Sequence, residues 1–286
     1  MEPHYSPSVR RRRLRKRLIH YREAKGQTTA EVAKGLGQGW SQAKVSRIEN
    51  GLKKTVTPAE LDALLDYYDE KDPAVRAELH ECAKLSSHKG WWAKYQGVLS
   101  SALPDFESEA SRIRTYECQV IPGLLQTPDY IEAIFRANQV RADEETRKRV
   151  DARLKRQEIL NRVDPPRYWV VLDEAALRRM VGSREVMLVQ LRHLTHMATR
   201  HNIDIQVLPF SEGAHTATTG SFVIMDFPDP RDASIAYMDA PTSSLYLEED
   251  GEVAEFESMF MGAQGSALSP EKSLEFIKDV IKSLEE

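Results

Sequence analysis

The spacing of apolar residues in the first 85 positions is that of a series of short helices. Residues 10–25 are expected to form the first helix, because Leu14, Leu18 and Tyr21 fall on one face and Gly26 follows. Four more helices are expected downstream: one after Thr28 that includes Leu36, one over residues 42–50, one that begins at Thr57 and one over about residues 72–85. The N-terminal region is therefore predicted to be all α-helical.

Local signals mark where these helices begin and end. Thr28 and Glu31 have the spacing of a capping box, in which the threonine accepts a hydrogen bond from a free backbone N–H and the glutamate reaches back to the cap. Ser41 is a good N-cap for the third helix. Three glycines break the chain between the second and third helices: Gly35, Gly37 and Gly39. Two short helices joined by a tight turn and followed by further helices are typical of a helix-turn-helix unit.

The pattern changes after a short polar stretch at residues 86–90. Helices are expected at residues 105–118, from Thr127, and at residues 143–162, 185–200, 252–264 and 269–284. Segments with the length and composition of strands are expected at residues 167–172, 203–209, 220–227, 234–238 and 244–248. Helices together with a cluster of strands favour an α+β fold. The chain is thus predicted to have an all-α helix-turn-helix domain at residues 1–86 and an α+β domain at residues 91–286.

Charge is distributed very unevenly between these two regions. Residues 1–54 contain 14 of the 40 basic residues and 4 of the 44 acidic residues, which gives this segment a net charge of +10 and leaves −14 for the remainder. A basic head on an acidic body is typical of a protein that binds a polyanion. A solvated helix face or a tail is the alternative explanation for a run of charge, and the predicted helix-turn-helix favours nucleic acid.

The helix over residues 42–50 is expected to read DNA. Val45 and Ile48 are spaced to face the domain core. The opposite side is polar or small: Gln42, Ala43, Lys44, Ser46 and Arg47. In a helix-turn-helix protein the second helix of the motif enters the major groove, where glutamine can pair with adenine and arginine with guanine, whereas lysine more often contacts phosphate. Double-stranded DNA is therefore the predicted partner, and a plain helical bundle with a polar exterior is the alternative.

Residues 28–51, TTAEVAKGLGQGWSQAKVSRIENG, resemble the helix-turn-helix of the phage-repressor-like, xenobiotic-response-element family. The resemblance implies that Glu49 pairs with an arginine of the first helix, here Arg22. It also implies four positions that read bases: Ser41, Gln42, Ala43 and Arg47. Phosphate contacts are expected from nearby basic and hydroxyl residues: Arg10, Arg11, Arg12, Arg13, Lys44, Ser46 and Lys53. The turn is about two residues longer than is usual in the family, at Gln38 and Gly39, which can tilt the reading helix.

The second region carries a different set of motifs. They are PGLLQTPDY at residues 122–130, RLKRQEIL at 153–160, LDEAALRR at 172–179, QLRHL at 190–194, VLPFSEGAH at 207–215 and ALSPEKS at 267–273. Together they resemble a domain of unknown function found behind helix-turn-helix domains in actinobacterial regulators, including the WhiJ-like proteins, over most of residues 91–284. The resemblance implies a transcription regulator, often encoded beside a small acidic protein that is a potential partner. It implies neither a ligand nor a catalytic mechanism.

Residues with catalytic or metal-binding potential are few in this region. The histidines that could share a metal are His193, His196, His201 and His215, but no HExxH pattern and no cysteine accompanies them. Glu117 and Glu174 could form a carboxylate pair for acid–base catalysis, although they are two of 44 acidic residues. The sequence has no GxSxG, GxxxxGK or GxGxxG loop. We therefore expect no enzymatic activity, no metal and no cofactor.

Binding of a small molecule or a partner is a stronger expectation for this region. Aromatic residues that could line a pocket, or simply form the core, are Trp91, Trp92, Tyr116, Tyr130, Trp169 and Phe222. The candidate contacts for an effector or partner are Gln126, Tyr130, Arg153 and Gln157. Solvated helix surface is the alternative explanation for the polar members of this group.

Compartment and assembly follow from simpler features. No apolar run approaches the roughly 18–20 residues that cross a bilayer, and no apolar segment follows the basic N-terminus as in a secretory signal. Cys82 and Cys118 are expected to be reduced thiols, so a cytoplasmic protein without a membrane partner is predicted. A homodimer is expected because paired DNA half-sites strengthen the weak binding of a single domain.

Two other functions stay open on the sequence alone. In the first, the chain is an antitoxin-like interaction protein that binds a small partner encoded nearby and autoregulates its operon. In the second, it is an enzyme with a DNA-binding domain.

Overall fold

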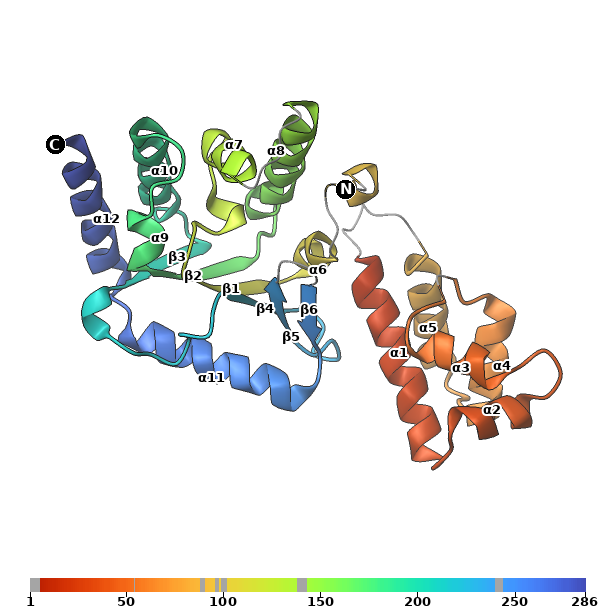
Figure 1. Ribbon diagram of the computed structural model, residues 1–286. Coiled ribbons are helices and arrows are strands. Elements are labelled where there is room, and N and C mark those ends of the chain that lie inside the picture. The colour runs from red at the N-terminus through yellow and green to blue at the C-terminus, as the bar shows by residue number, and fades with distance from the viewer. Residues whose placement is uncertain are drawn as a thin grey trace. The chain divides into compact units, whose positions relative to one another are not determined.

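A computed structural model describes residues 6–53, 55–87, 91–95, 98, 102–137, 143–239 and 244–286. The chain divides into two compact units, Met1–Ala93 and Lys94–Glu286. Figure 1 shows the helices of the first unit and the sheet and helices of the second.

The described part of the first unit folds into α-helices whose starts are set by capping. They are α1 (Pro7–Ala24), α2 (Thr29–Leu36), α3 (Gln42–Glu49), α4 (Pro58–Tyr68) and α5 (Pro73–Leu85). Ser6 accepts a hydrogen bond from the backbone N–H of Val9 at 3.1 Å, and this cap starts α1 before residue 10. The predicted capping box at Thr28 is present, and a second one begins α4 at Thr57.

The core of the first unit lies between these five helices. Its buried aliphatic residues are Leu14, Leu18, Val32, Val45, Ile48, Leu61, Leu64, Leu65 and Leu79. Each such side chain stabilises the fold by about 1.5–3 kcal/mol when it leaves water. Gly35 permits close packing of α2 on α4, because a Cβ there would lie 2.3 Å from Cε2 of Tyr67. The motif helices α2 and α3 are thus fixed on a scaffold made by the other three.

The second unit is built on a six-stranded sheet. The strands are β1 (Arg112–Glu117), β2 (Arg167–Asp173), β3 (Ile203–Leu208), β4 (Phe222–Asp226), β5 (Ile235–Asp239) and β6 (Ser244–Leu247). Their order in the sheet is β3-β2-β1-β4-β5-β6. β1, β2 and β3 are parallel, whereas β4, β5 and β6 follow as antiparallel neighbours. The direction of the strands therefore changes between β1 and β4.

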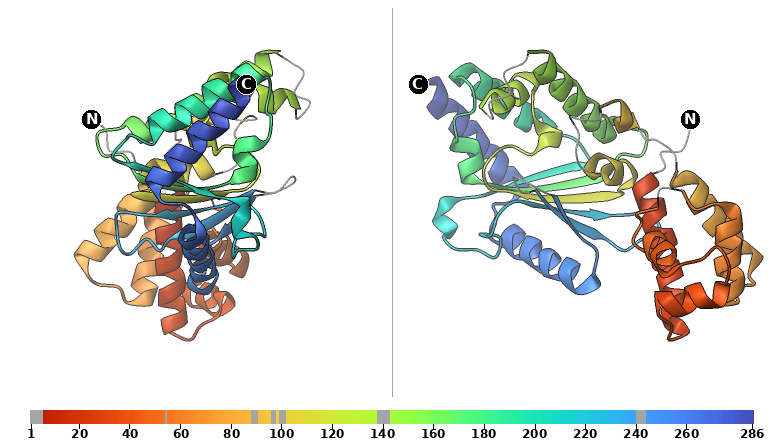
Figure 2. Two further views of the ribbon diagram at one scale, coloured as in Figure 1. Left: turned by 90° about the vertical axis from the view of Figure 1, so that its left-hand side faces the viewer. Right: turned by 45° about the vertical axis from the view of Figure 1, so that its right-hand side comes forward.

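Helices cover both faces of this sheet. They are α6 (Leu103–Glu109), α7 (Pro128–Ala137), α8 (Asp143–Gln157), α9 (Glu174–Arg178), α10 (Arg184–Met197), α11 (Asp250–Ser266) and α12 (Pro270–Glu285). Figure 2 shows α7, α8, α10 and α12 on one face and α11 on the other. Beneath α11 the core includes Tyr116, Phe222 and Phe260. The predicted fold class, an all-α helix-turn-helix domain followed by an α+β domain, is confirmed.

One predicted helix, over residues 105–118, is wrong. The chain instead forms α6, with Pro104 in its first turn, and then strand β1. β1 lies between β2 and β4, so its backbone groups bond to strands that are far away in the sequence. Charged residues in β1 concealed this strand: Arg114 is buried, and it donates to Asp226 at 2.9 Å and to Glu257 at 2.6 Å.

The remaining predicted elements end close to the observed bounds, with two differences. The helix expected over residues 143–162 ends as α8 at Gln157 and continues as a 3-10 helix over Glu158–Asn161. The short helix α9 has no counterpart in the prediction. Across the described ranges, no helix combines the length and the apolar character needed to cross a membrane.

Candidate nucleic-acid interface

Helix α3 is held by one side and leaves the other side accessible. Val45 and Ile48 are buried in the core, at 1% and 3% exposure. Ser41 caps the helix by accepting a hydrogen bond from the backbone N–H of Lys44 at 3.2 Å. The residues predicted to read bases are all exposed: Ser41, Gln42, Ala43 and Arg47. The structure therefore gathers them on the outer side of one helix.

Two polar contacts run along the outer side of α3. Nε of Arg47 donates to the carbonyl oxygen of Ala43 at 3.3 Å, so the guanidinium lies along the first turns of the helix. Nδ2 of Asn50 donates to the hydroxyl of Ser46 at 3.0 Å. Arg47 has no carboxylate partner among the described residues, and its charge is available to a ligand.

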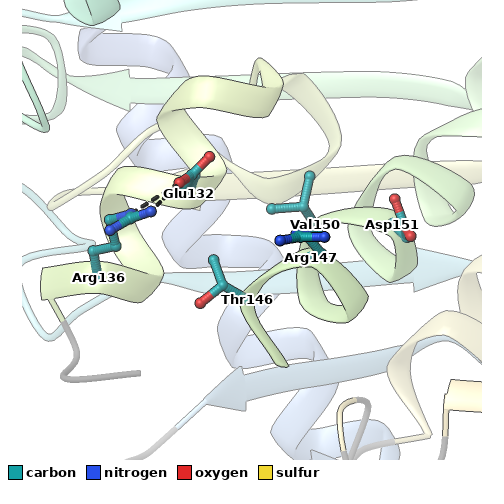
Figure 3. Close-up of a pocket in the computed structure, with 6 residues that line it drawn as sticks. All are labelled: Glu132, Arg136, Thr146, Arg147, Val150 and Asp151. Atoms are coloured by element: carbon teal, nitrogen blue, oxygen red, sulfur yellow. Dashed lines mark hydrogen bonds and ion pairs between the residues drawn. The ribbon is translucent and has the colours of Figure 1, made fainter. Parts of the chain in front are cut away.

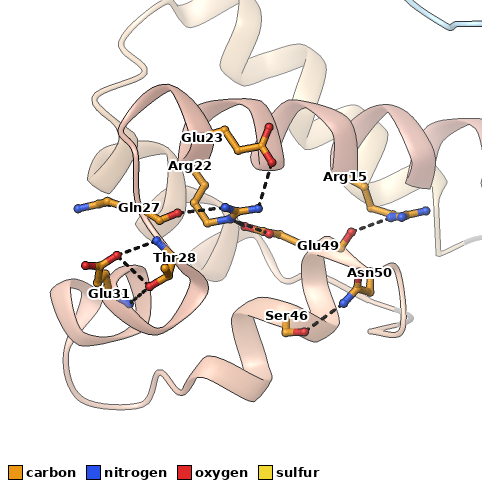
Figure 4. A network of polar contacts seen from close by, with 9 residues as sticks. All are labelled: Arg15, Arg22, Glu23, Gln27, Thr28, Glu31, Ser46, Glu49 and Asn50. Atoms are coloured by element: carbon orange, nitrogen blue, oxygen red, sulfur yellow. Dashed lines mark hydrogen bonds and ion pairs between the residues drawn. The ribbon is translucent and has the colours of Figure 1, made fainter. Parts of the chain in front are cut away.

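An ion pair between α1 and α3 anchors the other end of the helix (Figure 4). Nε of Arg22 donates to both carboxylate oxygens of Glu49, at 3.0 and 2.9 Å. Nη1 of Arg22 also donates to the carbonyl oxygen of Gln27 at 3.0 Å, just before α2 begins. Nε of Arg15 donates to the backbone oxygen of Glu49 at 2.7 Å. α1 thus fixes the end of α3 and the start of α2 together.

Burial dominates the electrostatics of this ion pair. The Glu49 side chain is 6% exposed and that of Arg22 is 17% exposed. Desolvation raises the pKa of Glu49, and the hydrogen bonds and charge of Arg22 offset only part of that rise. The carboxylate therefore depends on Arg22 to remain ionised in the folded domain.

Lys44 contacts the long turn between α2 and α3 and holds it in place. Gly37 and Gly39 have φ values of 79° and 85°, which residues other than glycine rarely adopt. Nζ of Lys44 donates to the carbonyl oxygen of Gly39 at 3.2 Å and lies 4.2 Å from the centre of the Trp40 ring. The same ammonium is 3.0 Å from Oε1 of Glu60. Lys44 therefore joins the extra residues of the turn to α4.

Glu60 is the centre of this network. It completes the capping box of α4 with Thr57, and it also contacts Nζ of Lys53 and Nζ of Lys44. Burial opposes ionisation of this carboxyl, but the hydrogen bonds from Lys53, from the Thr57 amide and from Lys44 together lower its pKa to about 2. The predicted phosphate contacts Lys44 and Lys53 thus already have an internal carboxylate partner.

The arginine run of α1 is also partly engaged inside the unit. Nη2 of Arg11 donates to the carbonyl oxygen of Ser86 at 2.9 Å. Arg12 is only 4% exposed. Nη1 of Arg13 lies 3.2 Å from Glu78, and the Arg13 side chain is 9% exposed. Successive residues on a helix point about 100° apart, so four consecutive arginines cannot all face one partner. The consecutive positions of these four arginines in the sequence already indicate that they cannot all contact DNA.

The comparisons with known proteins divide the chain in the same way as the geometry. Residues 13–79 match the model of a helix-turn-helix domain. Residues 100–279 match the model of a domain of unknown function, DUF5753. The chain belongs to the DUF5753 family. No curated protein and no solved structure matches the chain. The helix-turn-helix match supports a DNA-binding regulator, and the family assignment leaves the role of the second unit open.

Within the DUF5753 domain, the four predicted effector or partner contacts lie in one hydrogen-bonded region. Nη1 of Arg153 donates to Oε1 of Gln126 at 2.7 Å. Nε2 of Gln157 donates to the backbone oxygen of Gln126 at 2.8 Å. The hydroxyl of Tyr130 accepts from the backbone N–H of Ile121 at 3.2 Å. Gln126 and Tyr130 are buried, so Gln126 joins the segment before α7 to α8, and Tyr130 joins α7 to Ile121, rather than cover a solvated surface.

The residues considered for metal binding or catalysis contact different partners and do not form one site. In the part of the chain that the structure describes, no three His, Cys, Asp or Glu side chains are placed to hold a metal ion. His215 lies 3.4 Å from the Tyr116 hydroxyl and 3.8 Å from Asp173. Glu174 accepts from Arg178 and from the backbone N–H of Phe210. Glu117 hydrogen-bonds with Ser221 instead.

The aromatic residues weighed as pocket lining lie largely in the core. Tyr116 and Phe222 pack with ring centres 5.9 Å apart, and Trp169 lies against the same cluster. The side chain of Trp91 lies outside the described residues.

A hollow of about 310 Å³ lies between α7 and α8. It is lined by Glu132, Arg136, Thr146, Arg147, Val150 and Asp151 (Figure 3), none of which the sequence had indicated.

Proposed function

We propose that this protein is a sequence-specific double-stranded DNA-binding regulator of transcription that reads the major groove with α3. The observation that carries the proposal is the two-sided environment of this helix. Val45, Ile48 and Glu49 are buried and fixed, whereas Gln42 and Arg47 are exposed. A helix held rigidly by one side, with polar residues on the other, is what base recognition requires.

The chemistry of the exposed side chains suits the edges of base pairs. Glutamine can donate to and accept from adenine at once, and arginine can donate two hydrogen bonds to guanine. Ser41 and Ala43 are small enough to let the helix approach the groove. Gln42 and Arg47 are therefore the residues to which we assign base discrimination.

The finer parts of the proposal concern control and assembly. We place the helix-turn-helix in the xenobiotic-response-element type and propose a cytoplasmic homodimer, which would contact two half-sites roughly 34 Å apart. The acidic second unit, of WhiJ-like type, would act through a ligand or through a small acidic protein from a neighbouring gene. We propose binding, and not catalysis, as its role.

The proposal is tested by selecting duplexes from a random DNA library with the purified full-length protein. Enrichment of a defined motif is the expected result, and a palindromic motif would support the dimer. Recovery of unrelated sequences would contradict sequence-specific binding. Co-purification of a small protein that abolishes binding would instead favour the antitoxin-like interaction protein.

A further inference from the structure

Polar side chains form a row across one end of the sheet in the second unit. Glu117 is the last residue of β1, Ser221 directly precedes β4, Asp239 is the last residue of β5 and Ser244 is the first of β6. The registers of the β1–β4, β4–β5 and β5–β6 pairs bring these four positions into line. Residues opposite one another on paired strands point to the same face. All four therefore belong to one surface.

Hydrogen bonds connect neighbours within this row. Ser221 hydrogen-bonds with the carboxyl of Glu117. The hydroxyl of Ser244 donates to Oδ1 of Asp239 at 3.1 Å. Neighbouring strands are about 4.8 Å apart, so the backbones at Glu117 and Asp239 lie roughly 10 Å apart on either side of β4, with Ser221 between them.

Arg153 of α8 faces the same row. Its guanidinium is attracted by both Glu117 and Asp239, but it forms no ion pair with any residue that the structure describes. Nη1 donates to the neutral amide oxygen of Gln126 at 2.7 Å, and the guanidinium stacks on the ring of Phe135 at 4.6 Å. The charge of Arg153 is therefore oriented by neutral groups, and among the described residues no carboxylate lies within ion-pair distance of it.

Arg156, one turn further along α8, shows the contrast. Its Nη2 donates to Oε1 of Glu107 at 2.7 Å, and Glu107 is 1% exposed. This arginine and its carboxylate form a closed, buried pair. Arg153 has the same chemistry and a neighbouring position, but its carboxylate neighbours lie beyond ion-pair distance.

The environment of these groups disfavours their charges. Burial raises the pKa of Glu117 to about 7 and lowers the pKa of Arg153 to about 10. Both residues nevertheless keep part of their surface exposed. Charges that are partly withdrawn from water but unpaired are costly, and a molecule with the complementary charges would relieve that cost.

We propose that this end of the sheet binds a small zwitterion, an α-amino acid or a close analogue. Its carboxylate would accept hydrogen bonds from Arg153, whose planar guanidinium suits a carboxylate. Its ammonium group would donate to Glu117 and Asp239, and Ser221 lies between them. A ligand with only one of the two charges would leave either Arg153 or the carboxyl pair unmatched. In open parallel α/β sheets, ligands often bind beyond the carboxyl ends of the strands where the strand order reverses. Here the order reverses beside β1, whose carboxyl end carries Glu117, although its neighbour β4 is antiparallel.

The first experiment is isothermal titration of the full chain with each of the common L-α-amino acids. At least one is expected to bind with a 1:1 stoichiometry. The N-acetyl derivative of that amino acid lacks the ammonium group, and its amide derivative lacks the carboxylate. Each derivative should bind roughly tenfold or more weakly, because each loses hydrogen bonds between charged groups. Absence of binding by every amino acid, or equal binding of the derivatives, would overturn the proposal.

Variants locate the site. Glu117→Gln keeps the size of the side chain and should weaken binding by roughly tenfold or more, and Arg153→Met should do the same. The matched controls are Glu144→Gln and Lys148→Met, which alter an exposed ion pair on α8 and should leave affinity unchanged. If an amino acid binds equally to the wild type, Glu117→Gln and Arg153→Met, the assignment of the site is wrong. Because the readout is ligand binding alone, failure here is distinguishable from failure of the DNA-binding proposal.

Proton linkage provides a second readout. The charged or titratable groups that face Glu117 are Arg153 and Arg156 from α8, Asp239 from β5, Tyr130 from α7 and Tyr168 from β2. Burial raises the pKa of both tyrosines, so they stay neutral near pH 7. An ammonium group needs ionised Glu117, so affinity should rise between about pH 6 and about pH 8. Glu117→Gln should remove that rise, and a wild-type affinity that falls over this range would contradict the proposal.

Discussion

In the first unit Arg22 donates to carboxylate and carbonyl oxygens, whereas in the second unit the hydrogen-bond acceptor of Arg153 among the described residues is the amide oxygen of Gln126. The first arrangement holds helices in place, because both charges are neutralised inside the domain. The second leaves a charge with no ion pair among the described residues, next to the polar groups Glu117 and Asp239. The partner of an arginine, more than its presence, thus distinguishes a structural position from a candidate binding position.

The same distinction applies within the DNA-binding unit. Arg13, Lys44 and Lys53 all have acidic partners in the folded protein. Arg47 extends along α3 toward a backbone oxygen and remains exposed. Total positive charge therefore overstates the surface available to DNA, and the exposed outer side of α3 is the better indication of a DNA contact.

The largest expected effect comes from breaking the ion pair between α1 and α3. Arg22→Ala leaves the buried carboxylate of Glu49 without a partner, so the free energy of unfolding should fall by about 3 kcal/mol. Urea denaturation of the full-length variant measures the change. Lys34→Ala, an exposed substitution on α2, is the control and should stay within about 0.5 kcal/mol of the wild type. Equal stability of Arg22→Ala and the control would show that the pair does not anchor α3.

A somewhat smaller effect is expected at the outer side of α3. Arg47→Ala should lose discrimination at a single base pair, at a cost of about 1–3 kcal/mol, and should keep the stability of the fold. Competition binding with every single-base variant of the selected motif measures it. Gln42→Ala is the matched comparison and should affect a different base pair. If Arg47→Ala weakened all sequences equally, Arg47 would be a phosphate contact.

The carboxylate of Glu60 provides a pH-dependent effect. Its folded pKa of about 2 lies below its ordinary value of 4.5, so its contribution to stability is complete above about pH 4.5 and is lost as the pH falls toward 2. Glu60→Gln should therefore lower stability by about 1 kcal/mol near neutral pH, and this difference should shrink between about pH 5 and about pH 2. Urea denaturation of both proteins over this pH range tests the sign. A difference that grows toward acidic pH would contradict the assignment.

The smallest effect distinguishes internal pairing from phosphate contact in α1. Arg13→Ala is expected to leave the salt slope of DNA binding unchanged, because Arg13 is largely buried beside Glu78. A decrease of about one in that slope would mean that Arg13 leaves Glu78 to contact phosphate on DNA. Binding isotherms over a salt series measure the slope for the wild type and the variant.

Much of the first unit could be predicted because its signals are local. Capping residues such as Thr28 and Ser41 act on amides within three positions, and apolar spacing identifies each buried face. The exposed side of α3 follows from the same spacing. The Arg22–Glu49 contact was implied by the family resemblance, and the structure contains it.

What the sequence could not predict depends on contacts between distant segments. The sequence of β1 did not indicate a strand, because its charged residues suit a buried strand only once they are paired. Arg114 pairs with Asp226, which is 112 positions away in the sequence and lies on the neighbouring strand β4. The engagement of Lys44 by Glu60 and of Arg13 by Glu78 depends on how helices pack. The row that contains Glu117 arises from the registers of four strands, and no local pattern encodes it.

The most direct test of the central claim is binding of the purified full-length protein to the DNA upstream of its own gene, against scrambled competitor, over a salt series. We expect preferential binding that weakens steeply as salt rises, since phosphate contacts release counterions. Absence of any preference at every salt concentration would contradict the claim that α3 reads a base sequence.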